Sequence, residues 1–351
     1  MDFQFFQELL SIDSTSGKER KVAEWLAERL PGMFPAANRP VLRAEEVGDG
    51  TLNLLLTWGT PRIVFCSHLD TVPPYIEPIF PEGVFLSEPS LRETVIKGRG
   101  SCDAKGQVFA IVEACKRLAE EGKTDFGMLL LAGEETGSWG AKAFAKTDFR
   151  AEYLVVGEPT DNCMVSASKG TKSFDLKFTG EPFHSGYPQY GVSAVDLFVE
   201  FVNALKAKDF GMDPVLGETT WNIGLLHSDN PQNILSPELT CRLYFRTTFV
   251  SDEAVCQWMD EASSVIPGLT GNLAVTARGG DTPARYWTVE GLPSKSVAFG
   301  SDAPHLKNFT HKAICGPGSI TVAHRDDEHV LVADLATAVE QYIALYQAVS
   351  K

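Results

Sequence analysis

Several apolar runs in this sequence end at side chains that can bind a metal ion. They are Ile63–Cys66 ahead of His68, Met128–Ala132 ahead of Glu134 and Glu135, and Leu154–Val156 ahead of Glu158. Continuous apolar runs of this length are typical of strands buried on both faces, as in the parallel sheets of α/β domains. Ligands of such sheets bind beyond the carboxyl ends of the strands. We therefore expect one imidazole and three carboxylates to meet at one edge, which predicts a metal site and favours hydrolytic chemistry.

Further residues extend the predicted site to a pair of metal ions. Asp103 lies in a glycine-flanked loop just before a predicted helix, and His324 lies late in the chain. The candidate ligands now exceed the number that one tetrahedral ion needs, and they suit two divalent ions with a bridging carboxylate and a water molecule between them. Asp70 follows His68 by two residues, on the same side of an extended chain. Its carboxylate could orient the imidazole by accepting the other ring proton.

Each of these residues taken singly has an ordinary explanation. Two adjacent glutamates are usually a solvated pair, and a lone His or Asp after a strand is often a loop residue or a helix cap. The combination favours a metal site, because Glu134 and Glu135 follow five apolar residues directly and lie between two glycines.

The elements that must position these residues follow from hydrophobic periodicity. Helical spacing predicts helices over residues 18–30 and 104–121, and up to Glu158 the strands alternate with helices, which is α/β order. After residue 162 the pattern becomes that of half-exposed antiparallel strands, at residues 165–178, 239–249 and 272–277. Helices are predicted between them, at residues 193–208 and 252–266. The α/β order resumes with strands at 296–299 and 313–315 and a final helix over 330–349.

This organisation predicts two domains, as the length of 351 residues also does. Residues 1–162 and 279–351 form the first and second parts of an α/β domain, and residues 163–278 form an α+β insert.

Composition narrows the class of protein further. The chain has 46 acidic and 31 basic residues and a net charge of −15, so nucleic acid and anionic membrane surfaces would repel it. Its seven cysteines are scattered and include no CxxC pair, which indicates free thiols in a reducing compartment. There is no stretch of ~20 apolar residues and no signal-peptide pattern at the start. We therefore expect a cytoplasmic protein.

The set of motifs resembles a two-zinc family that contains acetylornithine deacetylase, succinyl-diaminopimelate desuccinylase, aminoacylases and carboxypeptidase G. Within it the chain looks closest to the acylornithine deacetylases, on the segment Gly316-Pro317-Gly318-Ser319 ahead of Ala323-His324. The resemblance covers nearly the whole chain. It implies a zinc-peptidase-like catalytic domain with a central, mostly parallel sheet, and an inserted α+β lid and dimerisation domain. The motifs that carry it are His68-x-Asp70, Asp103 in its loop, Gly133-Glu134-Glu135, Gly157-Glu158-Pro159 and His324.

The resemblance also implies a role for each residue. His68 and Glu158 would complete one zinc site, Glu135 and His324 would complete the other, and Asp103 would bridge the two. Two divalent ions are implied, with zinc expected and cobalt as the alternative. Glu134 is left as the general base, because a carboxylate beside two cations stays ionised and can take a proton from a bridging water molecule and pass it to the leaving amine.

The insert supplies further candidates. By the family pattern, His184 would reach the active site of a neighbouring subunit and stabilise the oxyanion, so that catalysis would require a homodimer; an exposed loop histidine is the alternative. Asn233 and Arg246 resemble residues that bind polar groups of the substrate, although Ser236 stands where the family usually has Pro. A solvated strand face is the alternative for Arg246. In the second part of the α/β domain, Ser301 could contact the substrate or only cap the next element.

These inferences predict a metal-dependent amide hydrolase that deacylates an N-acyl amino acid. The first expectation is N-acetyl- or N-succinyl-ornithine in arginine biosynthesis. The alternative is a dipeptidase or carboxypeptidase, or a deacylase of lysine, citrulline or diaminopimelate derivatives, and a catalytically inactive scaffold relative is a further alternative. A nucleotide-binding protein is disfavoured, because the sequence has no glycine-rich loop of the P-loop or Rossmann type.

Overall fold

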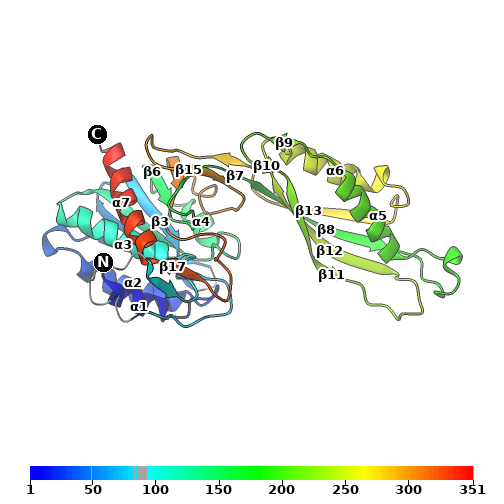
Figure 1. Ribbon diagram of the computed structural model, residues 1–351, viewed down its shortest axis with the longest axis horizontal. Coiled ribbons are helices and arrows are strands. Elements are labelled where there is room, and N and C mark those ends of the chain that lie inside the picture. Colours follow the sequence, from blue (N-terminus) through cyan, green and yellow to red (C-terminus); the bar gives the residue numbers. More distant parts are fainter. Residues whose placement is uncertain (49, 82–83, 85–92, 351) are drawn as a thin grey trace. The chain divides into compact units, whose positions relative to one another are not determined.

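The computed structural model describes residues 1–48, 50–81, 84 and 93–350, and the chain divides into two compact units (Figure 1). Unit 1 comprises residues 1–166, 286–295 and 301–351, and unit 2 comprises residues 167–285 and 296–300. The sequence placed the insert at residues 163–278. Unit 2 extends further along the chain, because β13 and β14 end at Gly279 and Arg285 and therefore belong to it.

Unit 1 is built on a six-stranded sheet in the order β1-β2-β5-β3-β6-β16. Its strands are β1 Val41–Val47, β2 Thr51–Gly59, β3 Ile63–His68, β5 Asp125–Leu131, β6 Ala151–Val156 and β16 Phe309–Ile314. The neighbours β5, β3, β6 and β16 are parallel to one another, and β2 pairs antiparallel with both β1 and β5. Every residue of β3 is buried, as expected of a central strand covered on both faces. The predicted α/β fold with a central, mostly parallel sheet is confirmed.

Helices of unit 1 pack against this sheet and against one another. They are α1 Phe3–Leu10, α2 Arg20–Arg29, α3 Lys105–Glu120, α4 Trp139–Phe144 and α7 Val332–Val349, with 3-10 turns at Leu30–Met33 and Ala36–Asn38. A two-stranded sheet joins β4 Val95–Lys97 to β17 His329–Leu331.

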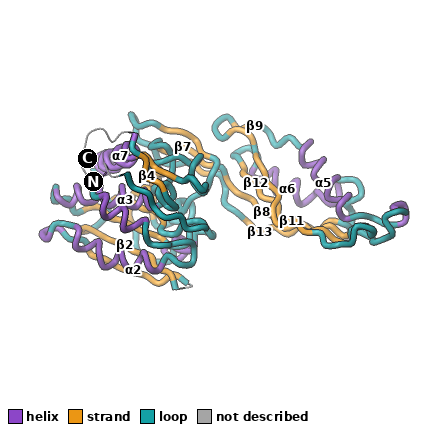
Figure 2. Tube along the Cα trace, turned by 60° about the horizontal axis from the view of Figure 1, so that its bottom comes forward, coloured by secondary structure: helices purple, strands orange, loops and turns teal. Residues whose placement is uncertain are grey.

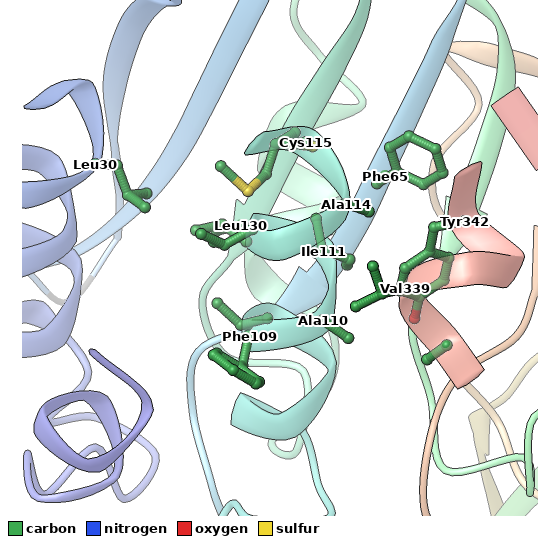
Figure 3. Packing of buried hydrophobic residues seen from close by; sticks show 14 of the residues in the cluster. Leu30, Phe65, Phe109, Ala110, Ile111, Ala114, Cys115, Leu130, Val339 and Tyr342 are labelled. Atoms are coloured by element: carbon green, nitrogen blue, oxygen red, sulfur yellow. The ribbon is translucent and has the colours of Figure 1, made fainter. Parts of the chain in front are cut away.

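Helix α3 is the centre of the unit 1 core. Thirteen of its 16 residues are buried, more than the one-sided pattern of its sequence suggested, because α1, α7 and the sheet all contact it. Figure 3 shows Ile111 of α3 between the sheet and α7, with Tyr342 of α7 beside Phe65 of β3. The two aromatic rings lie 5.5 Å apart, and the Tyr342 hydroxyl donates to the Cys315 carbonyl oxygen at 3.0 Å.

Unit 2 is an antiparallel sheet in the order β11-β12-β8-β13, with helices α5 and α6 on one face (Figure 2). Its strands are β8 Gly170–Thr179, β11 Thr220–His227, β12 Glu238–Thr247 and β13 Leu273–Gly279, and its helices are α5 Ala194–Ala207 and α6 Asp252–Val265. Buried and half-buried residues alternate along β12, the period that the sequence indicated. A short hairpin joins β9 Met212–Asp213 to β10 Gly217–Glu218, and a 3-10 turn lies at Pro188–Tyr190.

The strand predicted over residues 165–178 is two strands. β7 Met164–Ser168 ends where the chain passes from unit 1 to unit 2, and β8 begins at Gly170. β7 belongs to a small sheet with β14 Ala284–Arg285 and β15 Ser294–Val297.

Substitution of Phe109 by Ala should destabilise unit 1. The ring is fully buried and lies 4.5 Å from that of Phe6 and 5.6 Å from that of Phe3, so its removal leaves a cavity where the first helix packs on α3. The expected cost is about 3–5 kcal/mol, measured by urea unfolding of the full chain. Phe183→Ala, at a side chain that is 41% exposed, is the control. An unfolding curve of Phe109→Ala that overlays the wild-type curve would show that this contact contributes little.

Candidate metal centre

His68, Asp103 and Glu135 form a cluster with metal-binding geometry. Each offers one ligand atom, and the three atoms lie within 4.8 Å of one another. The elements bring them together as the sequence predicted: His68 ends β3, Asp103 lies just before α3, and Glu135 follows β5.

The two oxygens of Asp103 face different histidines. Oδ1 lies 3.1 Å from Nε2 of His68, and Oδ2 lies 3.3 Å from Nε2 of His324. The same nitrogen of His324 lies 3.0 Å from Oε1 of Glu135. Hydrogen bonds to the two carboxylates raise the pKa of His324 to about 10. Asp103 thus lies between the two imidazoles, with one carboxylate oxygen near each.

Two further carboxyl groups at this edge, those of Glu158 and Glu134, have raised pKa values, although the nearby His68 lowers both. The Glu158 side chain is 4% exposed, and its Oε1 has no hydrogen-bond partner among the described residues. Burial, together with the neighbouring carboxylates of Glu134 and Asp103, raises the pKa of Glu158 well above its usual value. Burial also raises the pKa of Glu134 well above its usual value, and the carboxylates of Asp302 and Glu135 add to the shift. Positive charge is what this cluster needs, and divalent cations would provide it, so the residues fit the metal ions that the sequence predicted.

Asp70 fixes the position of the loop that carries Glu134 and Glu135. Its Oδ1 accepts the backbone N–H of Glu134 at 2.9 Å, and its Oδ2 accepts that of Glu135 at 3.1 Å. The Ser16 hydroxyl also donates to Oδ2, at 2.9 Å. The Nδ1 atom of His68 is nearer to the carbonyl oxygen of Asp70, at 3.0 Å, than to its Oδ1, at 3.5 Å. Asp70 therefore orients the imidazole mainly through its backbone, and its carboxylate fixes the loop after β5.

Glu328 supports the Asp103 loop, a role that sequence analysis did not find. Its Oε1 accepts three backbone N–H groups, from Gly100, Cys102 and Asp103, at 2.9 to 3.1 Å. Its Oε2 accepts from Nη1 of Arg99 at 2.6 Å, and both side chains are 1% exposed. In the sequence, Glu328 is only one of several acidic residues after His324, and nothing in that run distinguishes it from its exposed neighbours.

Asp302 is a second buried carboxyl group that the sequence did not single out. It is 1% exposed, its Oδ1 has no hydrogen-bond partner among the described residues, and burial raises its pKa to about 6. Its neighbour Ser301, a predicted substrate contact, is buried, and its hydroxyl accepts the N–H of Ala303 at 3.3 Å. The Ser301 hydroxyl thus has a local backbone partner, and its contact with substrate stays a prediction.

The remaining predicted site residues belong to unit 2. His184 is exposed, and its backbone forms an isolated antiparallel β-bridge with Ile234. The backbone N–H of Ser185 donates to the Asn233 carbonyl oxygen at 2.9 Å, so the His184 loop and the Asn233 segment lie side by side. The Gly186 N–H donates to Nδ1 of His184 at 3.0 Å. Arg246 lies on β12, and its guanidinium carbon is 5.0 Å from the centre of the Tyr244 ring.

A mostly parallel sheet with imidazoles and carboxylates gathered beyond its strand ends defines a metal-dependent hydrolase of the α/β class. Residues 64–348 match the model of Peptidase family M20/M25/M40, and the chain belongs to this family.

Similar proteins agree with this assignment. A probable carboxypeptidase of Aspergillus terreus is 31% identical, over 98% of this chain and 85% of the relative. Among solved structures, a tripeptidase from Staphylococcus aureus has a TM-score of 0.79 at 19% identity and covers 97% of this chain and 95% of its own. The aminopeptidase PepT from Bacillus cereus has a TM-score of 0.76 at 21% identity, with coverage of 99% and 98%. The two structures support the fold. Among the described residues, no helix is long and apolar enough to cross a membrane.

Replacing Glu328 with Ala should weaken metal binding. The substitution leaves three backbone N–H groups and Arg99 without their shared acceptor, so the loop that carries Asp103 loses its support. We expect a 10–100-fold loss of zinc affinity, typical of a lost supporting contact, in a competition titration with a chelating dye. Asp327→Ala removes the same charge from an exposed side chain of the same loop and should bind zinc like the wild type. Equal affinities of the two variants would argue against this role.

Proposed function

We propose that this protein is a metal-dependent peptidase of the carboxypeptidase or dipeptidase type, which hydrolyses amide bonds of short peptides. The observation that carries the proposal is the position of Asp103 between His68 and His324, with the buried side chain of Glu158 beside it and one of its oxygens without a hydrogen-bond partner among the described residues. The family assignment supports a hydrolase, and the name of the Aspergillus terreus relative supports a carboxypeptidase over an ornithine deacylase.

We assign two groups of metal ligands around Asp103. His68 and Glu158 would hold one ion and Glu135 and His324 the other, with zinc expected and cobalt as the alternative. Support comes from the separate contacts of the two Asp103 oxygens and from the orphaned oxygen of Glu158. When bound, the ions would polarise the amide carbonyl and lower the pKa of a water molecule.

Glu134 is assigned as the general base. Its backbone is held by the Asp70 carboxylate, and it belongs to a turn in which its carbonyl oxygen accepts from Gly137 and Ser138. The side chain takes a proton from the attacking water and then donates it to the leaving amine.

Unit 2 is proposed to complete the site in a homodimer. His184 has Nδ1 engaged by Gly186, so its Nε2 is available to donate to the oxyanion in a second copy of the chain. Asn233 and Arg246 are proposed to bind the polar groups of the substrate. Strand β11 lies at the edge of its sheet, with Leu225 and Leu226 71% and 56% exposed, as expected of a strand that a second copy covers.

All seven cysteines are free, which supports the proposed cytoplasmic location.

Removal of N-acetyl or N-succinyl groups from ornithine is the second candidate, with the same chemistry. The segment that suggested it, Gly316–Ser319, has a structural explanation. Its Gly316 carbonyl oxygen accepts the N–H of Asn162 at 2.9 Å, and its Pro317 carbonyl oxygen accepts from Gln107 at 3.0 Å. The segment therefore supports the loop after β6 and carries no information on the amino acid that is bound.

The substitution Glu134→Gln should abolish turnover without loss of metal. The amide cannot accept the proton, so we expect kcat to fall by about 10²–10⁴-fold, while metal content measured by atomic emission stays that of the wild type. Glu120→Gln, at an exposed residue of α3, is the control for the charge change. Turnover within threefold of the wild type in Glu134→Gln would refute the assignment.

Chelation should abolish activity and zinc or cobalt should restore it, because the carboxylates need the charge of the ions. The restored enzyme is assayed with dipeptides, N-blocked dipeptides, N-acetylornithine and N-succinylornithine. We expect peptides to be cleaved at least tenfold more efficiently than either ornithine derivative. The reverse order would favour the deacylase, and no hydrolysis by protein that binds metal would favour the scaffold relative.

A further inference from the structure

A cavity of about 610 Å³ lies in unit 1, beside the loop that follows β5. None of the proposed metal ligands lines it, and neither does Glu134. Its walls come from the β5 loop, from α4 with the residues just after it, and from three segments distant in sequence, around residues 17–19, 47–51 and 305–307. The residues that matter here are Glu19, Gly133, Trp139, Lys142, Lys146 and Lys307.

The cavity is cationic in a protein of net charge −15. Lys142, Lys146 and Lys307 line it, and none of them forms an ion pair with a carboxylate of the described chain. Lys142 donates to the Gly137 carbonyl oxygen at 2.7 Å. The acidic lining residue, Glu19, is 1% exposed, and its Oε2 accepts the backbone N–H of Gly17 at 2.5 Å. The three lysines are exposed and outnumber Glu19 in the lining, so they give the cavity a positive charge that an anionic ligand would complement.

Trp139 provides an apolar wall beside these charges. It is the first residue of α4, and its side chain is 59% exposed. The Lys142 ammonium lies 5.5 Å from the centre of the indole ring. Tryptophan is enriched at interfaces, and the exposed indole ring offers a flat apolar face that the ring of a ligand can cover. The ligand should therefore carry a flat ring as well as a negative charge.

One short turn of the backbone, residues 133–139, links a wall of the cavity to the candidate metal centre. The backbone N–H of Trp139 donates to the Gly133 carbonyl oxygen at 3.1 Å. The backbone N–H groups of Gly137 and Ser138 donate to the Glu134 carbonyl oxygen at 3.0 and 3.1 Å. Gly133 has φ +67°, and a Cβ there would lie 3.2 Å from Cδ1 of the Trp139 ring. The indole therefore packs directly on the backbone that precedes Glu134, and any ligand that fixes Trp139 also fixes this backbone.

We propose that this cavity binds a small organic anion, a carboxylate or phosphate ester whose ring lies on Trp139 and whose charge is held by Lys142 and Lys146. Its occupancy is coupled to the metal centre through the Gly133–Trp139 turn. The coupling rests on the proposed function, which places Glu135 among the metal ligands, whereas the binding site itself does not. Coupling of this kind is reciprocal, so the anion changes zinc affinity by the same factor as zinc changes anion affinity.

Calorimetric titration of the zinc-loaded full chain tests the binding site. The probes are adenosine 5′-monophosphate and 1-naphthoate, with the neutral analogues adenosine and 1-naphthylmethanol as references. We expect each anion to bind at least tenfold more tightly than its neutral analogue. K142Q/K146Q and W139L should each weaken anion binding at least tenfold. The control K21Q/K206Q removes two exposed lysines elsewhere and should leave it within twofold. Melting temperatures verify that the variants are folded.

The outcomes separate cleanly. Absence of binding by both anions overturns the proposal, and so does binding that K142Q/K146Q and W139L leave unchanged, since the anion would then lie elsewhere, for example on zinc. Zinc affinity is measured with and without saturating 1-naphthoate, and a change of at least threefold in the wild type that is absent in W139L is expected. An unchanged zinc affinity overturns the coupling. No step requires turnover, so failure of the hydrolase assays leaves these results interpretable.

Discussion

Electrostatic repulsion among buried carboxylates is the constraint on which this molecule depends. The parallel strands β3, β5 and β6 end at one edge and bring Glu134 and Glu158 close to Asp103, where burial raises the pKa of both glutamates. Without cations, part of this cluster must hold protons or be repelled. The raised pKa values of Glu134 and Glu158 are therefore consistent with a site that binds divalent cations, as proposed above.

Two acids that are not proposed ligands make this arrangement possible. Asp70 accepts the backbone N–H groups of Glu134 and Glu135, and Glu328 accepts those of the Asp103 loop. Both carboxylates accept hydrogen bonds from donors of several segments, so neither needs a metal ion to satisfy its oxygens. The backbone segments that carry the proposed ligands Asp103 and Glu135 are thus fixed by hydrogen bonds to Glu328 and Asp70. This leaves their side chains free to turn toward the cations.

Periodicity predicted the parts of the molecule that depend on local pattern. The apolar runs of β3, β5 and β6 and the residues after them were sufficient to place His68 and Glu135 at one edge, because the carboxyl ends of parallel strands coincide. Glu328 and Asp302 could not be found in this way, since their roles depend on backbone groups and burial supplied by distant segments. Strand β11, residues 220–227, was also missed, although Trp221, Ile223 and Leu225 alternate with Asn222 and Gly224 as in a strand. It pairs with β12, and most of its residues are exposed.

Chemistry and substrate choice are carried by different parts of the chain in this proposal. The metal centre of unit 1 acts on an amide carbonyl and its leaving amine, which peptides and N-acyl amino acids share, so its geometry favours neither. The groups that can distinguish them extend from unit 2, where the backbone pairing of Ser185 with Asn233 ties the proposed oxyanion donor to a proposed substrate contact. A change in that pairing would move His184 and Asn233 together. Substitutions in unit 2 are therefore expected to change substrate specificity and turnover rate together. Metal affinity is expected to respond only to substitutions in unit 1.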